Sequence, residues 1–128
     1  MRLWHETLLS HLPRQQLLGQ HRECCALRGA GWGRKHSVVN YVFTHSPNKL
    51  VAYHCRVMDE MERRGYHPDK TWRDPEWRGN RLGKCEDWAS TEEFVGLVYA
   101  EHDDEYLQEC LDNLKSKGLE IKITPIGD

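Results

Sequence analysis

The sequence predicts a mainly α fold, a compact single domain of three to four helices joined by long loops. Apolar residues recur at helical spacing over residues 13–29 and 46–64, whereas prolines and glycines interrupt residues 66–88. The length of 128 residues suffices for one hydrophobic core but is short for two. We therefore expect residues 1–128 to form one domain.

Pro13 suits the first turn of the first helix, and Gly29 suits its end because it follows a basic residue. The i, i+3, i+4, i+7 pattern predicts a buried stripe formed by Leu17, Leu18, His21, Cys24, Cys25 and Arg28. The polar flank of the same helix holds Gln15, Gln16, Gly19, Gln20, Arg22 and Glu23.

A second helix is predicted from Ser46-Pro47 to residues 63–65. Its apolar stripe consists of Leu50, His54, Val57, Met58 and Met61. Between the two helices, the β-branched run 38–43 suggests either locally extended chain or a buried approach to the next helix. A third helix is expected over Ser90–Tyr99 and a fourth from residues 103–105 to Gly118, followed by an extended tail over 119–126.

The composition indicates a cytoplasmic protein that does not enter the membrane. The mean hydropathy is −0.80, 30% of the residues are charged, and no apolar run approaches the roughly 20 residues of a membrane span. No basic and then apolar leader is recognisable, and five cysteines without a framework spacing are typical of reduced thiols. We expect a monomer.

The net charge of −2 hides an asymmetry along the chain. Residues 1–85 contain 15 Lys/Arg and 8 Asp/Glu, whereas residues 86–128 contain 3 and 12. This division favours one face that meets a polyanion such as DNA and one that is repelled by it. The alternative is that both sets of charges are simply solvated.

Two basic stretches are interleaved with aromatic residues. They supply candidate phosphate contacts from Arg28, Arg34, Lys35, His36, Arg73 and Arg78. Trp72 and Trp77 could stack on an unstacked base, or they could pack into the core beneath a long loop.

Histidines and cysteines near residues 21–25 and 54–55 offer possible zinc ligands, but their spacing lacks a paired C-x-x-C or H-x-x-x-H motif. His21, Cys24, Cys25 and His54 also fall on the stripes predicted to be buried. We therefore expect no metal and no cofactor, with a zinc-stabilised interaction protein as an alternative.

The α-amine of Met1 and the carboxylate of Glu23 form a candidate catalytic pair. An α-amine has a reference pKa near about 8, so an appreciable fraction is a free nucleophile at neutral pH, unlike a lysine. Attack of an amine on C1′ of a damaged nucleotide gives an imine. The charge that develops on the sugar, and the later removal of a proton, both call for a nearby carboxylate.

The sequence resembles the pyrimidine-dimer DNA glycosylase family over roughly its first 70 residues. The resemblance rests on Arg2, Thr7-Leu8, Leu12, Gln15, Leu17, Arg22-Glu23, Gly29, Arg34-Lys35-His36 and the run Glu62–Tyr66. It implies a compact helical domain that acts on damaged double-stranded DNA without a cofactor. A DNA-binding module without catalysis on the same fold is the alternative.

By this resemblance, Met1, Glu23 and Arg22 are the catalytic residues, and Met1 acts through its α-amine. Arg2 and Arg22 would hold phosphates, while Gln15 and Gln16 would lie near the DNA. Arg2 also predicts that Met1 is retained, because aminopeptidases do not generally tolerate arginine at the second position. The chain departs from the family in its acidic C-terminal end and in Ala26, where the family has a second helix arginine that Arg28 could replace.

Overall fold

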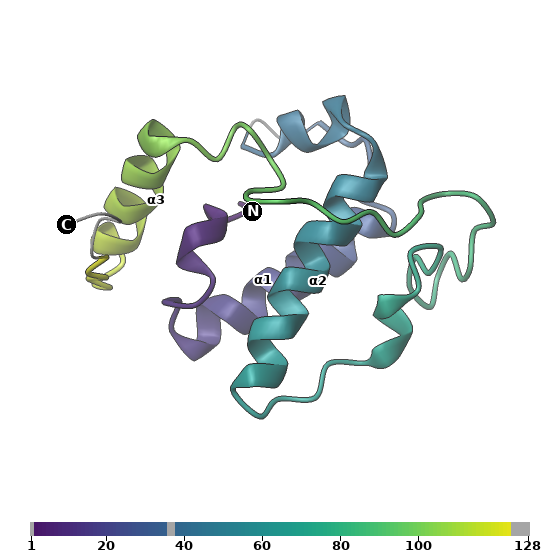
Figure 1. The fold of residues 1–128 in the computed structure, drawn as a ribbon, viewed down its shortest axis with the longest axis horizontal. Helices are drawn as coiled ribbons and strands as arrows, with labels where there is room; N and C mark the ends of the chain where they lie inside the picture. Colours follow the sequence, from purple (N-terminus) through teal and green to yellow (C-terminus); the bar gives the residue numbers. More distant parts are fainter. Residues whose placement is uncertain (1, 36–37, 124–128) are drawn as a thin grey trace.

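The computed structural model describes residues 2–35 and 38–123. Its elements, in chain order, are η1 (Glu6–Leu8), α1 (Arg14–Arg28), η2 (Asn40–Thr44), α2 (Pro47–Arg63), η3 (Lys70–Arg73) and α3 (Asp104–Ser116) (Figure 1). Within the described residues these are three α-helices and three short 3₁₀ helices, and β pairing is limited to one isolated bridge. The predicted mainly α fold is confirmed. No helix in the described part of the chain has the length and apolar character that a membrane span requires.

The ends of α1 and α2 follow the predicted signals. Pro13 caps the start of α1, and Gly29 ends it by donating its N–H to the carbonyl of Cys25 at 3.0 Å. A Cβ on Gly29 would lie 3.1 Å from the carbonyl oxygen of Arg78, so the close approach of that segment favours glycine. At the start of α2, the Ser46 hydroxyl accepts the N–H of Asn48 at 3.1 Å.

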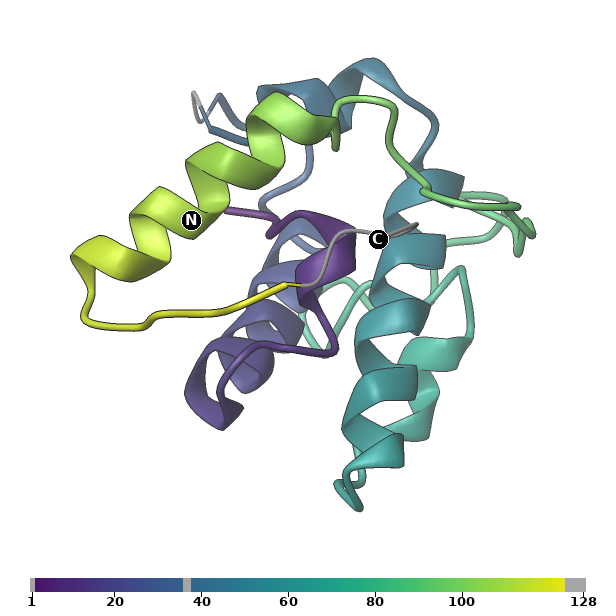
Figure 2. The same ribbon diagram turned by 60° about the vertical axis from the view of Figure 1, so that its left-hand side comes forward.

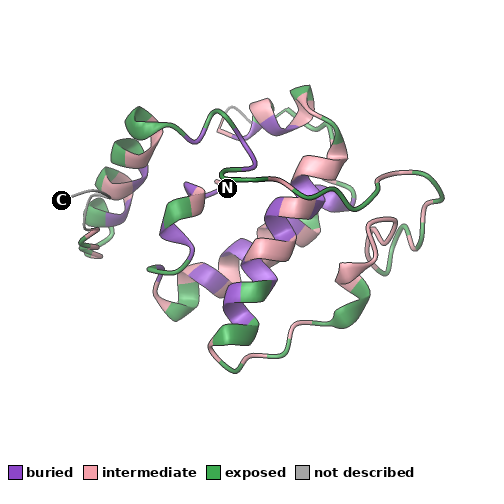
Figure 3. Ribbon diagram, viewed as in Figure 1, coloured by how far each residue is buried: buried purple, intermediate pink, exposed green. Residues whose placement is uncertain are grey.

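The core forms where α1 and α2 pack together, as the buried residues on their facing sides show (Figure 3). Every member of the stripe predicted for α2 is buried, from Leu50 to Met61. On α1, Leu17, Cys24 and Arg28 of the predicted stripe are buried, whereas Leu18, His21 and Cys25 are half-buried. Gln20 and Leu27, which the pattern left off the stripe, are buried as well, so the helical period predicted the buried side of α2 in full and that of α1 in part.

The N-terminal segment lies between α3 and the α1–α2 pair (Figures 1 and 2). Its apolar side chains, Leu3, Trp4, Leu8, Leu9 and Leu12, are all buried in the same core. The apolar side chains of this segment therefore form the part of the core against which α3 packs.

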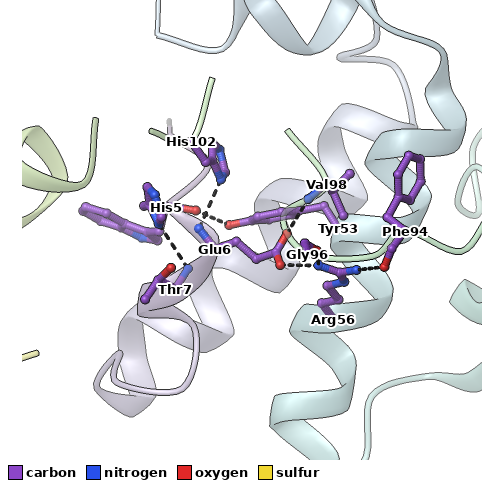
Figure 4. Close-up of polar contacts among 10 residues, drawn as sticks. His5, Glu6, Thr7, Tyr53, Arg56, Phe94, Gly96, Val98 and His102 are labelled. Atoms are coloured by element: carbon purple, nitrogen blue, oxygen red, sulfur yellow. Dashed lines mark hydrogen bonds and ion pairs between the residues drawn. The ribbon is translucent and has the colours of Figure 1, made fainter. Parts of the chain in front are cut away.

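The helix expected over residues 90–99 is not formed. Arg56 of α2 donates to the carbonyl oxygens of Phe94, at 2.7 Å, and of Gly96, while Glu6 accepts the N–H of Val98 at 3.0 Å (Figure 4). Gly96 has φ of +77°, a conformation that leaves the helical region. Side chains from elsewhere thus satisfy the backbone that a helix would have satisfied internally.

Two extended segments expected from the sequence also differ from the structure. Residues 40–44 of the β-branched run form η2. The tail shows no strand over residues 119–123, and residues 124–128 lie outside the described part of the chain. Among the described residues neither segment has a neighbouring strand to pair with, and alternation alone does not make a strand.

His102 is buried where the chain returns to the N-terminal segment (Figure 4). Its Nδ1 accepts the N–H of Glu6 at 3.1 Å, and its Nε2 lies 2.8 Å from the Tyr41 hydroxyl. Burial, assisted by the nearby His5, lowers the pKa of His102 to about 4. A proton on Nδ1 would face the N–H of Glu6, so the folded protein disfavours the imidazolium.

We expect the free energy of unfolding to fall as the pH drops from about 7 to about 4. The unfolded imidazole, with an ordinary pKa near about 6.5, gains a proton over this range and the folded one does not. His102 alone accounts for about 3 kcal/mol at most. Urea denaturation of the wild type and of His102→Asn, which keeps an acceptor but does not titrate, measures the effect. The variant should show a shallower dependence of stability on pH, and an equal slope would contradict the assignment.

Candidate active site

Side chains hold the main chain of residues 2–4. The N–H of Arg2 donates to Oε2 of Glu23 at 3.2 Å, and the carbonyl of Arg2 accepts from Nε2 of Gln20 at 2.9 Å. Two residues further on, the N–H of Trp4 donates to Oε1 of Gln20 at 2.6 Å. The bond from Arg2 brings the carboxylate predicted to be catalytic next to the second residue of the chain.

The other two helices complete this attachment. The Tyr53 hydroxyl of α2 donates to the carbonyl of Trp4 at 2.6 Å, and the Tyr106 hydroxyl of α3 donates to the carbonyl of Leu3 at 2.6 Å. Each of the three α-helices therefore contributes a polar side chain to the same short segment. Such bonds fix the position of a backbone that has no strand partner.

A pocket of about 200 Å³ opens beside Glu23. Its lining comes from the N-terminal segment, α1, α3 and the loop before η2, and consists of Arg2, Trp4, Glu23, Val38, Asn113 and Lys117. It thus combines one carboxylate, two cationic side chains, an amide and an indole. This combination suits an anionic ligand that carries a polar, flat group.

The Arg2 guanidinium lies near two aromatic rings, 5.7 Å from the centre of Trp4 and 5.9 Å from that of Tyr106. It also lies 3.4 Å from Glu109, whose side chain is 63% exposed. An ion pair with so exposed a partner is weak. A phosphate could therefore take the place of Glu109 without a large loss.

The predicted residues of α1 spread along the surface that carries Glu23. Glu23 and Gln16 are half-buried, while Arg22 and Gln15 are exposed. Arg22 and Gln15 are seven residues apart, so they lie on one side of the helix. The structure therefore exposes Arg22 and Gln15 on one side of α1, and neither lines the pocket.

Arg34 and Lys35 are exposed in the loop that follows α1. Met1 and His36, which the sequence also assigns to the site, lie outside the described residues.

Arg28 corrects one of the expected DNA contacts. Its side chain is fully buried, and its guanidinium donates to the carbonyls of Trp72, Asp74 and Trp77 at 2.8, 2.8 and 3.0 Å. It also stacks on the ring of Trp72 at 5.1 Å. Arg28 thus joins the end of α1 to the segment after η3, and it cannot reach a phosphate. The periodicity had placed this residue on the buried stripe, and that placement is confirmed.

Arg73 and Arg78 are also engaged within the protein. Arg73 pairs with Asp59 and Glu62 at 2.9 Å each. Arg78 donates to the carbonyls of Arg28 and Gly29 at 2.8 and 3.1 Å. Neither arginine lines the Glu23 pocket.

Within the part of the chain that the structure describes, one cluster has the composition of a metal site, and it lies apart from the pocket. His21 Nδ1 and His54 Nε2 are 2.8 Å apart, and the Cys25 sulfur lies 3.8 and 3.9 Å from the two rings. All three ligand atoms lie within 4.8 Å of one another.

The hydrogen bonds of this cluster disfavour a metal. Arg28 donates to Nδ1 of His54 at 3.0 Å, so His54 carries its proton on Nε2 and donates it to His21. A metal on Nε2 would move that proton to Nδ1, where it would face the guanidinium. Burial and the charge of Arg28 hold the pKa of His54 well below its ordinary value, and burial raises the pKa of Cys25 to about 11. The cluster is therefore a neutral, hydrogen-bonded part of the core.

Sequence reasoning missed seven residues that build or line the site. They are Trp4, Gln20, Val38, Tyr53, Tyr106, Asn113 and Lys117. Apolar periodicity gives no sign of a buried polar side chain that bonds to distant backbone. The basic last turn of α3 was the one available hint of Lys117.

Comparison with known proteins identifies one relationship. A family model described as pyrimidine dimer DNA glycosylase matches residues 1–74. The match contains α1, α2 and Glu23, and it ends before α3 begins. No curated protein and no solved structure matches the chain significantly.

Arg28→Met should lower the free energy of unfolding by about 3–5 kcal/mol, because it leaves three buried carbonyls and His54 without their donor. Arg22→Met on the same helix is the matched control, since Arg22 is exposed and should change stability by less than about 0.5 kcal/mol. Urea denaturation measures both. Equal stability of the two variants would contradict the structural role of Arg28.

Proposed function

The chain belongs to the pyrimidine dimer DNA glycosylase family, whose model covers more than half of it, and from this membership we propose that it excises a damaged base and cleaves the resulting abasic site. The nucleophile is the α-amine of Met1, with Glu23 as the assisting carboxylate. Damaged double-stranded DNA is the substrate, and no metal or cofactor takes part.

The observation that carries this proposal is the hydrogen bond from Arg2 N to Glu23, at 3.2 Å. Residue 1 is joined to that nitrogen by one peptide bond, and consecutive Cα atoms are only about 3.8 Å apart. Chain connectivity thus keeps the α-amine within one residue's length of the nitrogen that donates to this carboxylate. Proximity of a nucleophile and a base is the requirement for covalent catalysis.

The proposed reaction proceeds in two stages. The neutral amine bonds to C1′ as the glycosidic bond breaks and its electrons leave with the base, which takes up the proton that the nitrogen loses. The sugar ring then opens, O4′ takes a proton from water, and the nitrogen lone pair forms the C=N bond of an iminium, which water hydrolyses after strand cleavage to free the amine. Loss of a C2′ proton to Glu23 then drives elimination of the 3′ phosphate, which breaks the strand. The ionised carboxylate stabilises the cationic sugar before it accepts this proton.

The pocket and its surroundings suit DNA on both sides of the reacting sugar. Arg2 and Lys117 offer positive charge within the pocket, and Arg22 offers it on the adjoining surface of α1. Arg34 and Lys35 extend the basic surface beyond the end of α1. We assign phosphate contacts to these exposed cations, since phosphates provide most of the affinity for DNA.

Trapping with borohydride on a duplex that contains an abasic site tests the amine. We expect a covalent adduct with the wild type, and none when a Gly-Ser extension converts the Met1 amine into a peptide nitrogen. The same extension at the C-terminus is the matched control. An adduct that survives the N-terminal extension would assign the reaction to another amine, a lysine or the new terminus, and overturn the role of Met1.

Glu23→Gln should bind the abasic duplex within about threefold of the wild type, because the amide oxygen still accepts the N–H of Arg2. Its strand cleavage should fall by at least about 100-fold, because the amide cannot accept the C2′ proton. Single-turnover cleavage and equilibrium binding measure the two effects. Unchanged cleavage would refute the role of Glu23.

Arg22→Ala and Lys35→Ala should each weaken binding and reduce the slope of log affinity against log salt by about one. Arg63→Ala removes the same charge from an exposed residue that pairs with Glu60, and it should leave the slope unchanged. Fluorescence anisotropy on a labelled duplex measures these slopes. Equal slopes for all three variants would mean that net charge, not direct contact, governs binding.

A further inference from the structure

Gln20 is almost completely buried, with 1% of its surface exposed, although it belongs to the polar flank of α1. Its amide makes four polar contacts. Oε1 accepts from Trp4 N at 2.6 Å and shares, at 2.9 Å, the single Tyr53 hydroxyl proton that is also directed to the carbonyl of Trp4. Nε2 donates to the carbonyl of Arg2 at 2.9 Å and to Oε2 of Glu23 at 3.2 Å. A buried glutamine with a polar contact at every position has one fixed orientation.

The orientation of this amide is determined on its acceptor side. Because the Trp4 N–H can only donate and the Arg2 carbonyl can only accept, Oε1 faces Trp4 and Nε2 faces Arg2 and Glu23. The bonds to Arg2 and Trp4 then resemble those that a neighbouring strand would make to alternate residues. One side chain thus fixes the position along α1 at which the N-terminal segment crosses this helix.

Gln20 also fixes the carboxylate, which lies one helical turn further along α1. Glu23 accepts two hydrogen bonds from the described residues, one from Gln20 Nε2 and one from Arg2 N, and both end on Oε2. Two donors on one oxygen determine the plane of a carboxylate and leave Oε1 for another partner. Among the described residues, none donates to Oε1.

We propose that Gln20 is the positioning residue of this site: it sets the distance between the start of the chain and Glu23, and it directs Oε1 of Glu23 toward the reacting sugar. This inference rests on the proposed function. Displacement of a reacting group by about 1 Å can cost about 100-fold in rate, so loss of the amide should act on the chemical step. Gln20 itself exchanges no proton with the substrate.

The test compares Gln20→Met with Tyr53→Phe. Gln20→Met removes the donor to Glu23 and the bonds to Arg2 and Trp4. Tyr53→Phe removes a hydroxyl from the same buried cluster but leaves both donors of Glu23 in place. Both variants lose stability, and thermal denaturation measures how far each of them is destabilised. A difference in the rate of the chemical step between equally destabilised variants is then due to the loss of the Gln20 amide.

Single-turnover cleavage of an abasic duplex under saturating enzyme should fall about 100-fold in Gln20→Met and less than about threefold in Tyr53→Phe. Binding to a duplex with a non-cleavable tetrahydrofuran abasic analogue should stay within about threefold of the wild type in both. Equal cleavage rates in the two variants would overturn the proposal. Failure of the wild type to form a borohydride adduct would instead overturn the proposed function, so the two failures are distinguishable.

Gln20→Glu gives a second readout, and it replaces Gln20→Met if that variant does not fold. At neutral pH its carboxylate turns an acceptor toward Arg2 and Glu23, so cleavage should be slow. Once protonated, the acid can again donate one hydrogen bond. The ratio of variant to wild-type rate should therefore rise as the pH falls, and a ratio that does not change with pH would count against positioning by Gln20.

Discussion

The attachment of residues 2–4 to side chains of all three α-helices is the interaction on which the rest of this structure depends. Among the described elements, α1 and α2 pack directly on one another, whereas α3 shares few close contacts with either. The N-terminal segment joins them, through Gln20 of α1, Tyr53 of α2 and Tyr106 of α3. Each bond contributes only about 1 kcal/mol, but a buried carbonyl left without its donor costs about 1–3 kcal/mol. The segment is therefore held as a unit.

A second attachment, around Arg28, does the same work away from the pocket. Its guanidinium donates to one carbonyl of η3, to two carbonyls of the segment after η3 and to Nδ1 of His54, so this part of the chain is held against both α1 and α2. The same guanidinium fixes the tautomer of His54 and removes the His21–Cys25–His54 cluster from metal chemistry. The protein thus uses buried polar side chains to satisfy backbone groups that a neighbouring strand would satisfy in other folds. Gln20 does so at the candidate site, and Arg28 does so at the end of α1.

Apolar periodicity could predict α1, α2 and the interface between them, because burial of Leu17, Leu50 or Met61 follows directly from helical spacing. Resemblance to a family could indicate Glu23 and Arg22. Neither could predict that Arg56 and Glu6 would bind the backbone of residues 94–98 in place of a helix, since those bonds join distant parts of the chain. Arg28 shows most clearly that two sequence signals can conflict, because its position in the apolar pattern indicated burial and its charge indicated exposure. It is buried because four acceptors satisfy its guanidinium inside the protein. Gln20 was hidden for the same reason, because its partners are backbone groups that a pattern of side chains does not reveal.

The acidic residues of the last third of the chain are not spread evenly around the pocket. The start of α3 carries three carboxylates, those of Asp103, Asp104 and Glu105, which interact favourably with the positive end of the helix dipole. The Asp103 side chain also accepts the N–H of Tyr106 at 2.8 Å and so caps the helix. Thirteen residues of helix span about 20 Å, so these acids are separated from the other end of α3, where Asn113 and Lys117 line the pocket. The charge asymmetry of the sequence thus overstates the repulsion at the site: the acidic start of α3 lies at the far end of the helix, and the pocket receives Lys117 from α3, while the Glu109 carboxylate of the same helix pairs with Arg2. Since the family match ends before α3, the residues on this wall of the pocket are the part of the site that the shared family pattern does not specify.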